Sequence, residues 1–513
     1  MKTRFFCLKN VTISKSIKYF LKLFFIFTFI SSYSFAANYP LEVLQPQENL
    51  DVENRFYKAY PGFEYNVRMA VKGGDYPFKY KLTESPPGMT INGATGEISW
   101  PSPNESGTAY DVTAAVTDAE SSAQTVSWTI QVTTDGFLFV DAVNGNSVVA
   151  GGTGTIGNPW KSLNDVYEGN NGATKYQEAN PGSFGYWRAG TYGMDAPIDD
   201  AGSDGMRVTW RGSVRPQVWL AYPGDAMPVI NQDAALLYFA DSHPDFWMEG
   251  LNFHATNARG QGINISSSKE RVVFRKNIFS DLTQGFEKGN SAHVFIRRHA
   301  YGYNYTFQDN IFRDVPLGYG ILVYAVTGAL IEDNLFENIG DHAIGLKVAA
   351  RGWDVRANRF RNNGRDSISL HHNRWEDHYS GDTEVRFNVI ENGGGFVHSL
   401  QSQQALGYPV YIYRNTIYDN AQQTGATETN GPFYWTNNII VNNLSGSRVV
   451  DKIYRLANAA PERVHVIDNL TGSPEDGIID NHGNLTAEYA EFIGTYGHQL
   501  GNPPLPPVLK VNR

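Results

Sequence analysis

Two stretches of this chain decide its fold: Leu330-Ile331-Glu332-Asp333-Asn334-Leu335-Phe336 and Asp354-Val355-Arg356-Ala357-Asn358-Arg359-Phe360. Each is a short strand that ends in Asn, and in most copies of this pattern an apolar pair follows the Asn. Related runs place Asn at 252, 277, 310, 388, 415, 438 and, more weakly, 469. From residue 252 onward the steps between these asparagines are 25, 33, 24, 24, 30, 27, 23 and 31 residues. This internal repeat is the strongest feature of the sequence.

A repeat of at least 23 residues, with two or three short strands in each unit, predicts the coils of a right-handed parallel β-helix. We expect Asn to recur because it tolerates the left-handed turn conformation and can stack on the Asn of the next coil. A leucine-rich horseshoe would need a Leu-x-x-Leu-x-Leu skeleton, and a propeller would need longer units. The longer steps predict loops inserted on one side of the coil.

Outward from the repeat, the chain divides into four parts. Residues 1–37 hold six of the 42 basic residues and no acidic residue, followed by the apolar run Leu23–Ile30 and a Ser34-Phe35-Ala36 cleavage pattern. This predicts a secretory signal peptide and a secreted or periplasmic protein. The apolar run is too short for a membrane anchor. We assign 38–134 to a β-sandwich, 135–475 to the β-helix and 476–513 to a C-terminal extension.

In the second part, the runs Tyr110–Val116 and Thr125–Val132 alternate as strands do, and turn residues separate them. The stretch Pro87–Ile98 (PGMTINGATGEI), together with a strand ending in Val116-Thr117-Asp118, resembles the immunoglobulin-like domains that bacteria attach to secreted enzymes. The resemblance implies a sandwich and no activity. We expect such a domain to act as a spacer, with sugar or partner binding as the alternative.

The net charge limits the classes of partner that we expect, and the cysteine content limits the disulfides. Without the signal segment the chain keeps 36 basic and 52 acidic residues, a net charge of −16. Such a surface repels nucleic acid and anionic lipid, so we expect neither as a partner. The only cysteine, Cys7, lies within the signal segment, so no disulfide is expected. We expect a monomer with no membrane contact once the signal is removed.

A second strand of each coil carries the candidate site. Aligning these strands by their inward aliphatic pairs places the residue after the second aliphatic on the outer face. That alignment uses Ile368 with Leu370, and then Leu400. Successive coils then present Ser266, Arg297, Tyr324, Lys347, His371 and Gln401, about 4.8 Å apart. Loop residues Arg351, His372, Arg374 and Glu376 are expected to reach the same face as substrate-binding residues, together with Gln401.

These residue types suit an anionic polysaccharide. A uronate sugar is cleaved by β-elimination when a cation neutralises its carboxylate, a base takes the adjacent proton and an acid serves the leaving oxygen. Lys347 is the candidate base if Arg297 and His371 lower its pKa, and Tyr324 or His371 is the candidate acid or alternative base. Arg297, Arg351 or Arg374 would hold the carboxylate.

A family resemblance points the same way. The run Gly340–Lys347 (GDHAIGLK), followed by Asn358–Asn362 and Ser367–His372, resembles the catalytic coils of the chondroitinase B and alginate lyase family. The resemblance implies that Lys347 is the base. At the position of the family's assisting arginine this chain has His371, and in place of the family's calcium-binding acidic pair it has Asp341-His342. Calcium is therefore a cofactor that the resemblance allows, and no other cofactor or metal site is expected.

Two further functions stay open. A glycoside hydrolase acting on an anionic or sulfated polysaccharide would need two carboxyl groups, for which Asp341 and Asp366 are candidates. Turn capping is the structural alternative for both aspartates. A non-catalytic glycan-binding protein is the third possibility, because β-helices also serve as stalks.

Overall fold

We analysed a computed structural model of the chain. It describes residues 39–48, 54–162, 165, 184–193, 207–210, 218–232, 236–239, 245–255, 260–266, 269–282, 290–297, 302–347, 350–371, 383–400, 409–418, 425–428, 433–436, 438–441, 454–456, 464–467, 470–473, 477–480 and 485–487. The expected signal segment, and the expected site residues His372, Arg374, Glu376 and Gln401, lie outside these residues. No helix in the described part of the chain has the length and apolar character needed to cross a membrane.

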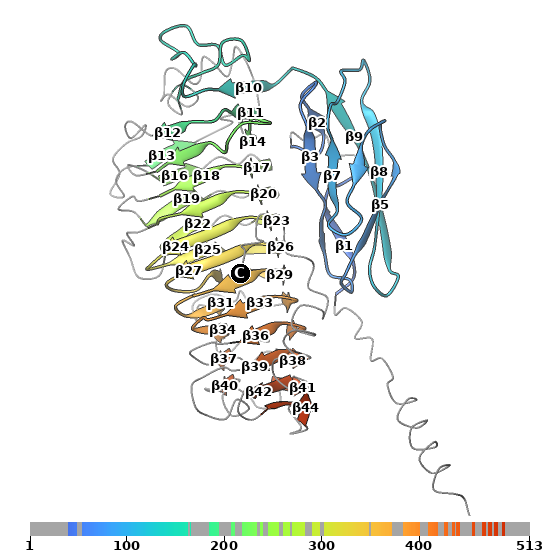
Figure 1. Ribbon diagram of the computed structural model, residues 1–513, viewed down its shortest axis with the longest axis vertical. Helices are drawn as coiled ribbons and strands as arrows, with labels where there is room; N and C mark the ends of the chain where they lie inside the picture. Colours follow the sequence, from blue (N-terminus) through green and yellow to red (C-terminus); the bar gives the residue numbers. More distant parts are fainter. Residues whose placement is uncertain are drawn as a thin grey trace, which may run out of the picture.

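From residue 137 onward, the chain winds into a parallel β-helix with three strands in most coils, so that three sheets run along the stack (Figure 1). Sheet 1 contains β10 (Phe137–Val140), β11 (Phe184–Trp187), β14 (Val218–Ala221), β17 (Asp245–Glu249), β20 (Arg271–Arg275), β23 (Gly302–Gln308), β26 (Val326–Glu332), β29 (Arg351–Arg356), β32 (Thr383–Arg386), β35 (Val410–Tyr413), β38 (Phe433–Thr436) and β41 (Val464–Ile467). Sheet 2 contains β12 (Thr191–Gly193), β15 (Val229–Asn231), β18 (Asn252–His254), β21 (Ile278–Ser280), β24 (Ile311–Val315), β27 (Leu335–Ile339), β30 (Arg359–Arg361), β33 (Val389–Glu391), β36 (Thr416–Tyr418), β39 (Ile439–Val441), β42 (Leu470–Ser473), β43 (Gly477–Asp480) and β44 (Leu485–Ala487). Sheet 3 contains β13 (Arg207–Trp210), β16 (Leu236–Phe239), β19 (Gln261–Ile265), β22 (Ala292–Ile296), β25 (Tyr319–Tyr324), β28 (Ile344–Lys347), β31 (Asp366–His371), β34 (Gly395–Leu400), β37 (Gly425–Glu428) and β40 (Tyr454–Leu456).

The repeated asparagines form a buried ladder between sheets 1 and 2. The side-chain amide of Asn334 donates to Asn358 Oδ1 at 3.0 Å, and Asn334 Oδ1 accepts from the amide of Asn310 at 2.9 Å. The same bond links each member of the ladder to the next: Asn277, Asn310, Asn334, Asn358, Asn388, Asn415 and Asn438. Leu251 rather than Asn252 occupies the equivalent position in the preceding coil, because its N–H bonds Asn277 Oδ1. Asn469 lies outside the described residues.

Of the two expected reasons for the ladder, contact from one Asn to the Asn of the next coil is seen, whereas the left-handed conformation is not. The left-handed residue is the one before each asparagine, for example Asp333 at φ 56° and Ala357 at φ 55°. The ladder asparagines are therefore selected for their hydrogen bonds along the stack rather than for their backbone conformation. A second column of left-handed residues, between sheets 2 and 3, does show the expected tolerance, with Asp314, Asn338 and Asn362 among its members.

Inside the coil, stacked aromatic rings fill the space between the sheets. Phe253, Phe279, Phe312, Phe336 and Phe360 lie one above the next, with ring centroids 4.7–5.1 Å apart. Parallel in-register strands bring the same inward position of each coil into line, which explains the apolar pair after each ladder asparagine. Buried aliphatic residues of sheet 3, such as Ile344 and Leu346, complete the core.

The N-terminal residues fold into a β-sandwich. One sheet has the order β2 (Lys58–Ala59), β9 (Ala123–Val132), β8 (Tyr110–Thr117) and β5 (Lys79–Glu84), and another β3 (Tyr65–Arg68), β7 (Glu97–Trp100) and β6 (Thr90–Ile91). A two-stranded sheet pairs β1 (Glu42–Gln45) with β4 (Ala70–Lys72). The two strands predicted by alternation correspond to β8 and β9.

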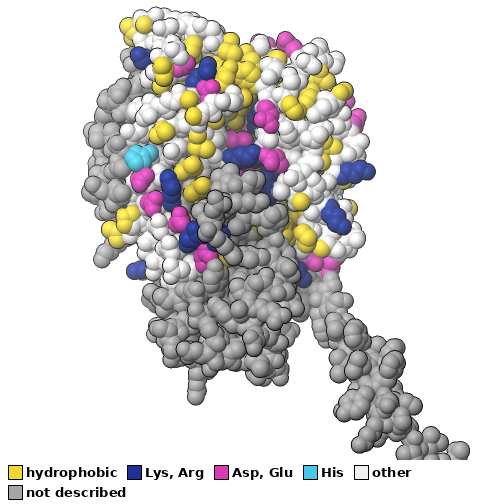
Figure 2. Space-filling model, in the orientation of Figure 1, with side chains coloured by type: hydrophobic (Ala, Val, Ile, Leu, Met, Phe, Trp, Pro, Cys, Tyr) yellow, Lys and Arg dark blue, Asp and Glu magenta, His cyan; other side chains and the backbone are white. Residues whose placement is uncertain are grey.

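The sandwich lies alongside the coils and packs on the outer face of sheet 1, rather than standing apart as a spacer (Figure 1). Arg68 of the sandwich bonds Asp309 at 2.7 Å and Asp333 at 2.5 Å on two successive coils. In the other direction, the fully buried Arg275 of sheet 1 reaches Glu97 of the sandwich at 2.7 Å. Basic and acidic side chains accordingly meet where the two domains join (Figure 2).

The described residues of the expected C-terminal extension form strands. β43 pairs antiparallel with β42, and β44 with β43, so both strands continue sheet 2. Backbone groups at the last coil would otherwise form an open sheet edge, which an antiparallel hairpin covers.

Candidate functional site on sheet 3

Sheet 3 brings the expected row into one column. Val323 pairs with Ile296 and Tyr324 pairs with Lys347, which in turn pairs with His371. Arg297, which follows Ile296, therefore precedes Tyr324 in the column. Inward and outward positions alternate as predicted, since Ile344 and Leu346 are fully buried in the core. The backbone of His371 lies in this column, and its side chain lies outside the described residues.

The last step of the expected alignment is wrong by one residue. Val397 pairs with Ile368 and Ser399 with Leu370, so Leu400 rather than Gln401 lies beside His371. The sequence alignment had matched Leu400 to Leu370 because both are aliphatic. Backbone register, not residue type, decides which residue stands in the column.

Lys347 is held in an aromatic setting. Its Nζ lies 4.8 Å from the ring centroid of Tyr319 and 5.8 Å from that of Tyr324. The residue is only 9% exposed. Burial lowers the pKa of Lys347 below its ordinary value, and the negative charge of Asp341 partly opposes that shift. A lysine in this environment can be neutral, and hence basic, at a lower pH than a solvated lysine.

Tyr319 and Asp341 form a second pair beside Lys347. Burial raises the pKa of Tyr319 well above its ordinary value, and the negative charge of nearby Asp341 adds to that rise. Arg365 from the next coil lies 3.2 Å from Asp341 Oδ1. Gly345 allows this packing, because a Cβ there would meet Tyr319 Cε1 at 2.8 Å. The raised pKa keeps Tyr319 protonated at neutral pH.

His342 ties the neighbouring coil to this cluster. Its Nδ1 lies 2.9 Å from the Asp366 carbonyl oxygen and so donates to the backbone, not to the Asp366 carboxylate. The Tyr319 and His342 rings lie 5.7 Å apart. The two expected hydrolase acids stand at different positions of the repeat. Asp366 aligns with His342 of the preceding coil, whereas Asp341 aligns with Arg365 of the next coil.

Two expected residues are directed elsewhere. The guanidinium of Arg297 lies 5.1 Å from the Tyr238 ring, two coils back along sheet 3 and away from Lys347. Arg351 is the first residue of β29 in sheet 1 rather than part of a loop beside the column. It lines a pocket between the sandwich and the coil. Neither arginine therefore holds an anion next to Lys347.

Sequence reasoning missed Tyr319 and Arg365. Arg365 follows Asp341 by 24 residues, which is the local coil length between Asn334 and Asn358, so their contact was readable from the repeat. Tyr319 carried no such signal, because the register of sheet 3 pairs Gly345 with Leu322 rather than with Tyr319. Tyr324, by contrast, lies where the repeat predicted, and its hydroxyl donates to Asn290 Oδ1 at 3.1 Å.

Calcium does not fit the residues seen around Lys347. Among the described residues no three His, Cys, Asp or Glu side chains converge into a group that could hold a metal. The Asp341 carboxylate instead faces Arg365 and Tyr319.

Comparisons with known proteins agree with this architecture. Residues 243–405 and 299–452 match the family described as "Right handed beta helix region", and residues 54–133 match the one described as "Putative Ig domain". The fold class predicted from the repeat is thus confirmed: an all-β chain with a right-handed parallel β-helix after an immunoglobulin-like domain. This fold is common to polysaccharide-degrading enzymes and is consistent with action on a polysaccharide.

The other comparisons are distant. No curated protein matches the chain. Among solved structures, ORF18 of Geobacillus virus E2 is similar over 70% of this chain and 68% of that one, at 10% identity and a TM-score of 0.28.

Proposed function

We propose that this protein is an exported lyase that cleaves a uronate-containing anionic polysaccharide by β-elimination, with Lys347 as the base. The observation that carries the proposal is the buried lysine of lowered pKa beside Tyr324 on the outer face of sheet 3. A base needs a pKa near the working pH, and burial moves the pKa of Lys347 in that direction.

The residues of the cluster divide the work of the elimination. Neutral Lys347 takes the proton from the carbon next to the sugar carboxylate, and that electron pair becomes a carbon–carbon double bond. The bond to the glycosidic oxygen then breaks, and this oxygen takes a proton from the hydroxyl of Tyr324. Arg365, whose side chain is 66% exposed and lies 3.2 Å from Asp341, is assigned to hold the substrate carboxylate.

Tyr319 is assigned a positioning role rather than that of the acid. Its raised pKa opposes proton loss, while its ring lies against the Lys347 amine and helps to hold it in place. Tyr324 is less buried than Tyr319 and can meet a substrate oxygen.

The test compares two products of cleavage. The protein is incubated with alginate, chondroitin sulfate, dermatan sulfate, pectate and sulfated algal glycans, and ultraviolet absorbance of the conjugated double bond is recorded beside the yield of reducing ends. Elimination predicts that both signals rise together. Reducing ends without absorbance would contradict the lyase and indicate hydrolysis, and neither signal with retained binding would indicate a glycan-binding protein.

A further inference from the structure

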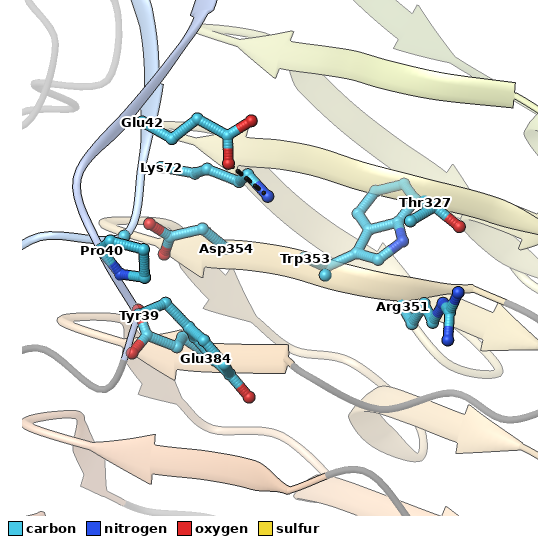
Figure 3. Close-up of a pocket in the computed structure, with 11 residues that line it drawn as sticks. Tyr39, Pro40, Glu42, Lys72, Thr327, Arg351, Trp353, Asp354 and Glu384 are labelled. Atoms are coloured by element: carbon cyan, nitrogen blue, oxygen red, sulfur yellow. Dashed lines mark ion pairs between the residues drawn. The ribbon is translucent and has the colours of Figure 1, made fainter.

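The junction between the sandwich and the coil forms a pocket that the elimination chemistry does not use. Its volume is about 450 Å³, which lies within the range of sites for small ligands, and such sites are frequent between domains. Tyr39, Glu42 and Lys72 come from the sandwich side, and Thr327, Arg351 and Glu384 from sheet 1 (Figure 3). Neither domain alone would make this pocket.

Its polar groups point into a shared space. Lys72 Nζ pairs with Glu42 Oε2 at 3.0 Å on one side, and Arg351 lies at the far end (Figure 3). Gly328 and Gly352, at equivalent places in successive coils, have φ values of 67° and 69°. Their missing side chains keep the backbone bare beneath Lys72, since a Cβ at either one would lie within 4.0 Å of Nζ. Cations and a carboxylate over bare backbone suit a ligand rich in hydroxyl groups.

An aromatic strip continues the pocket along sheet 1. Glu384 pairs with Tyr411, and Tyr411 pairs with Tyr434 in the next coil. The rings of Tyr411 and Tyr434 stack at 4.8 Å, and Tyr39 meets Tyr411 edge-on at 5.6 Å. Half-buried aromatic faces next to charged hydrogen-bonding groups offer the two kinds of contact that sugar rings make, apolar on the face and polar at the edge.

The pocket also lies close to the proposed site of cleavage. Arg351 follows Lys347 by four residues around one corner of the coil, so their Cα atoms are at most roughly 14 Å apart. A polysaccharide bound over Lys347 can therefore extend around that corner to Arg351.

We propose that the domain junction, from Arg351 through Lys72 and Glu42 to Tyr39, Tyr411 and Tyr434, is a binding subsite for sugar units of an acidic polysaccharide. Arg351 takes an acidic group of the sugar, Lys72 and Glu42 take hydroxyl groups, and the tyrosines take ring faces. The inference rests on the proposed function for the class of polysaccharide. It gives the immunoglobulin-like domain a direct part in binding.

The experiment measures binding without cleavage. Size-defined oligosaccharides of alginate, chondroitin sulfate, dermatan sulfate and pectate are titrated into the full chain carrying Lys347→Met. Arg351→Ala and Thr327→Trp are then added singly to that chain. Thr327 is exposed, so Trp at this position fills the pocket without disturbing the core. Arg351→Ala should bind a long oligosaccharide about tenfold more weakly, as expected for the loss of one charge-assisted contact. Thr327→Trp should weaken binding to a similar degree because it fills the pocket, and both variants should bind a disaccharide unchanged.

Arg313→Ala is the matched control, because Arg313 is 46% exposed on sheet 2 and far from the pocket in the coil. Equal affinity of the parent and both pocket variants, or no binding of any of the four glycans, would overturn the subsite. If the pocket variants lose binding but the unmutated protein gives no elimination product, the subsite stands and the lyase fails. If the unmutated protein gives the elimination product, and Arg351→Ala and Thr327→Trp in a chain that keeps Lys347 cleave long chains as the unmutated protein does, the subsite fails alone.

Discussion

At the scale of single residues, the site depends on how one lysine is buried. Lys347 has lost most of its water and lies against two tyrosine rings, while Asp341 is the charge that opposes the resulting fall in its pKa. The balance of these two effects sets the pH at which the amine becomes a base.

Replacing Lys347 with Met should remove the base and keep the packing, because the two side chains have similar length. We expect kcat on the cleaved uronate polymer to fall at least about a hundredfold, as is typical for loss of a general base, with thermal unfolding unchanged. Lys81→Met, at an exposed position on β5, is the control and should keep full activity. Retention of kcat by Lys347→Met would exclude Lys347 as the base.

Removing the charge of Asp341 gives a second test, because the direction in which the pH profile should shift is known. Asp341 raises the Lys347 pKa, so Asp341→Asn should let burial lower that pKa further. The amine would then become neutral at lower pH, and the rising limb of the kcat–pH profile should move toward acid while activity is retained. A hydrolase that used Asp341 as its acid would lose activity instead, so the profile separates the two reactions.

At the scale of elements, the asparagine ladder fixes the register that creates the site. Asn334 donates to Asn358, Phe307 and Glu332 and accepts from Asn310, all with buried partners. A slip of one residue would break these bonds and would turn the outward column of sheet 3 inward. The ladder and the column of Lys347 are therefore two consequences of one register.

Asn334→Ala should lower the free energy of unfolding by about 3 kcal/mol, because several buried groups lose their partners together. Asn338→Ala is the matched control four residues away. Asn338 is exposed and bonds Asp314 at 2.9 Å, but its φ is 57°, so Ala there should cost about 1 kcal/mol, mostly as backbone strain. Chemical denaturation of both variants measures the difference, and equal costs would show that the buried ladder is not a special source of stability.

At the scale of the whole molecule, buried charges join the two domains. Arg68 meets Asp309, Glu332 and Asp333, while Arg386 reaches the carbonyl oxygens of Gly73 and Gly74. Removing one partner of such a network leaves unpaired charges in a dry interface, which is costly. The sandwich is thus part of one folded unit with the coil.

Arg68→Met should lower the free energy of unfolding by about 3–5 kcal/mol at a pH of about 8. Burial and neighbouring carboxylates raise the pKa of Asp333 to about 7, and Arg68 holds that pKa down. Because the folded pKa lies above the ordinary value, the folded protein gains a proton, and this group's contribution to stability rises, as pH falls through that range. Without Arg68 the pKa rises further, so the penalty should shrink toward a pH of about 5. A penalty independent of pH would contradict this account of Asp333.

The sequence by itself determined the β-helix, the sandwich and the alternation that places Tyr324 and Lys347 on one outer face. These follow from local periodicity, which each coil repeats and which neighbouring coils reinforce. It did not determine the Leu400 register, because an aliphatic residue fits either phase of a short strand. Nor could it show that the Tyr319 ring lies against Lys347, or that Arg297 points away from it.

Only the tertiary structure decided that the sandwich lies against sheet 1 and closes a pocket with it. Contacts such as Arg68 with Asp333 join residues 265 positions apart, and no periodic pattern records such a distance. A sequence repeat determines which residues of one coil stack on the next coil. Docking of one domain on another depends on the match between two finished surfaces, which exists only after both have folded.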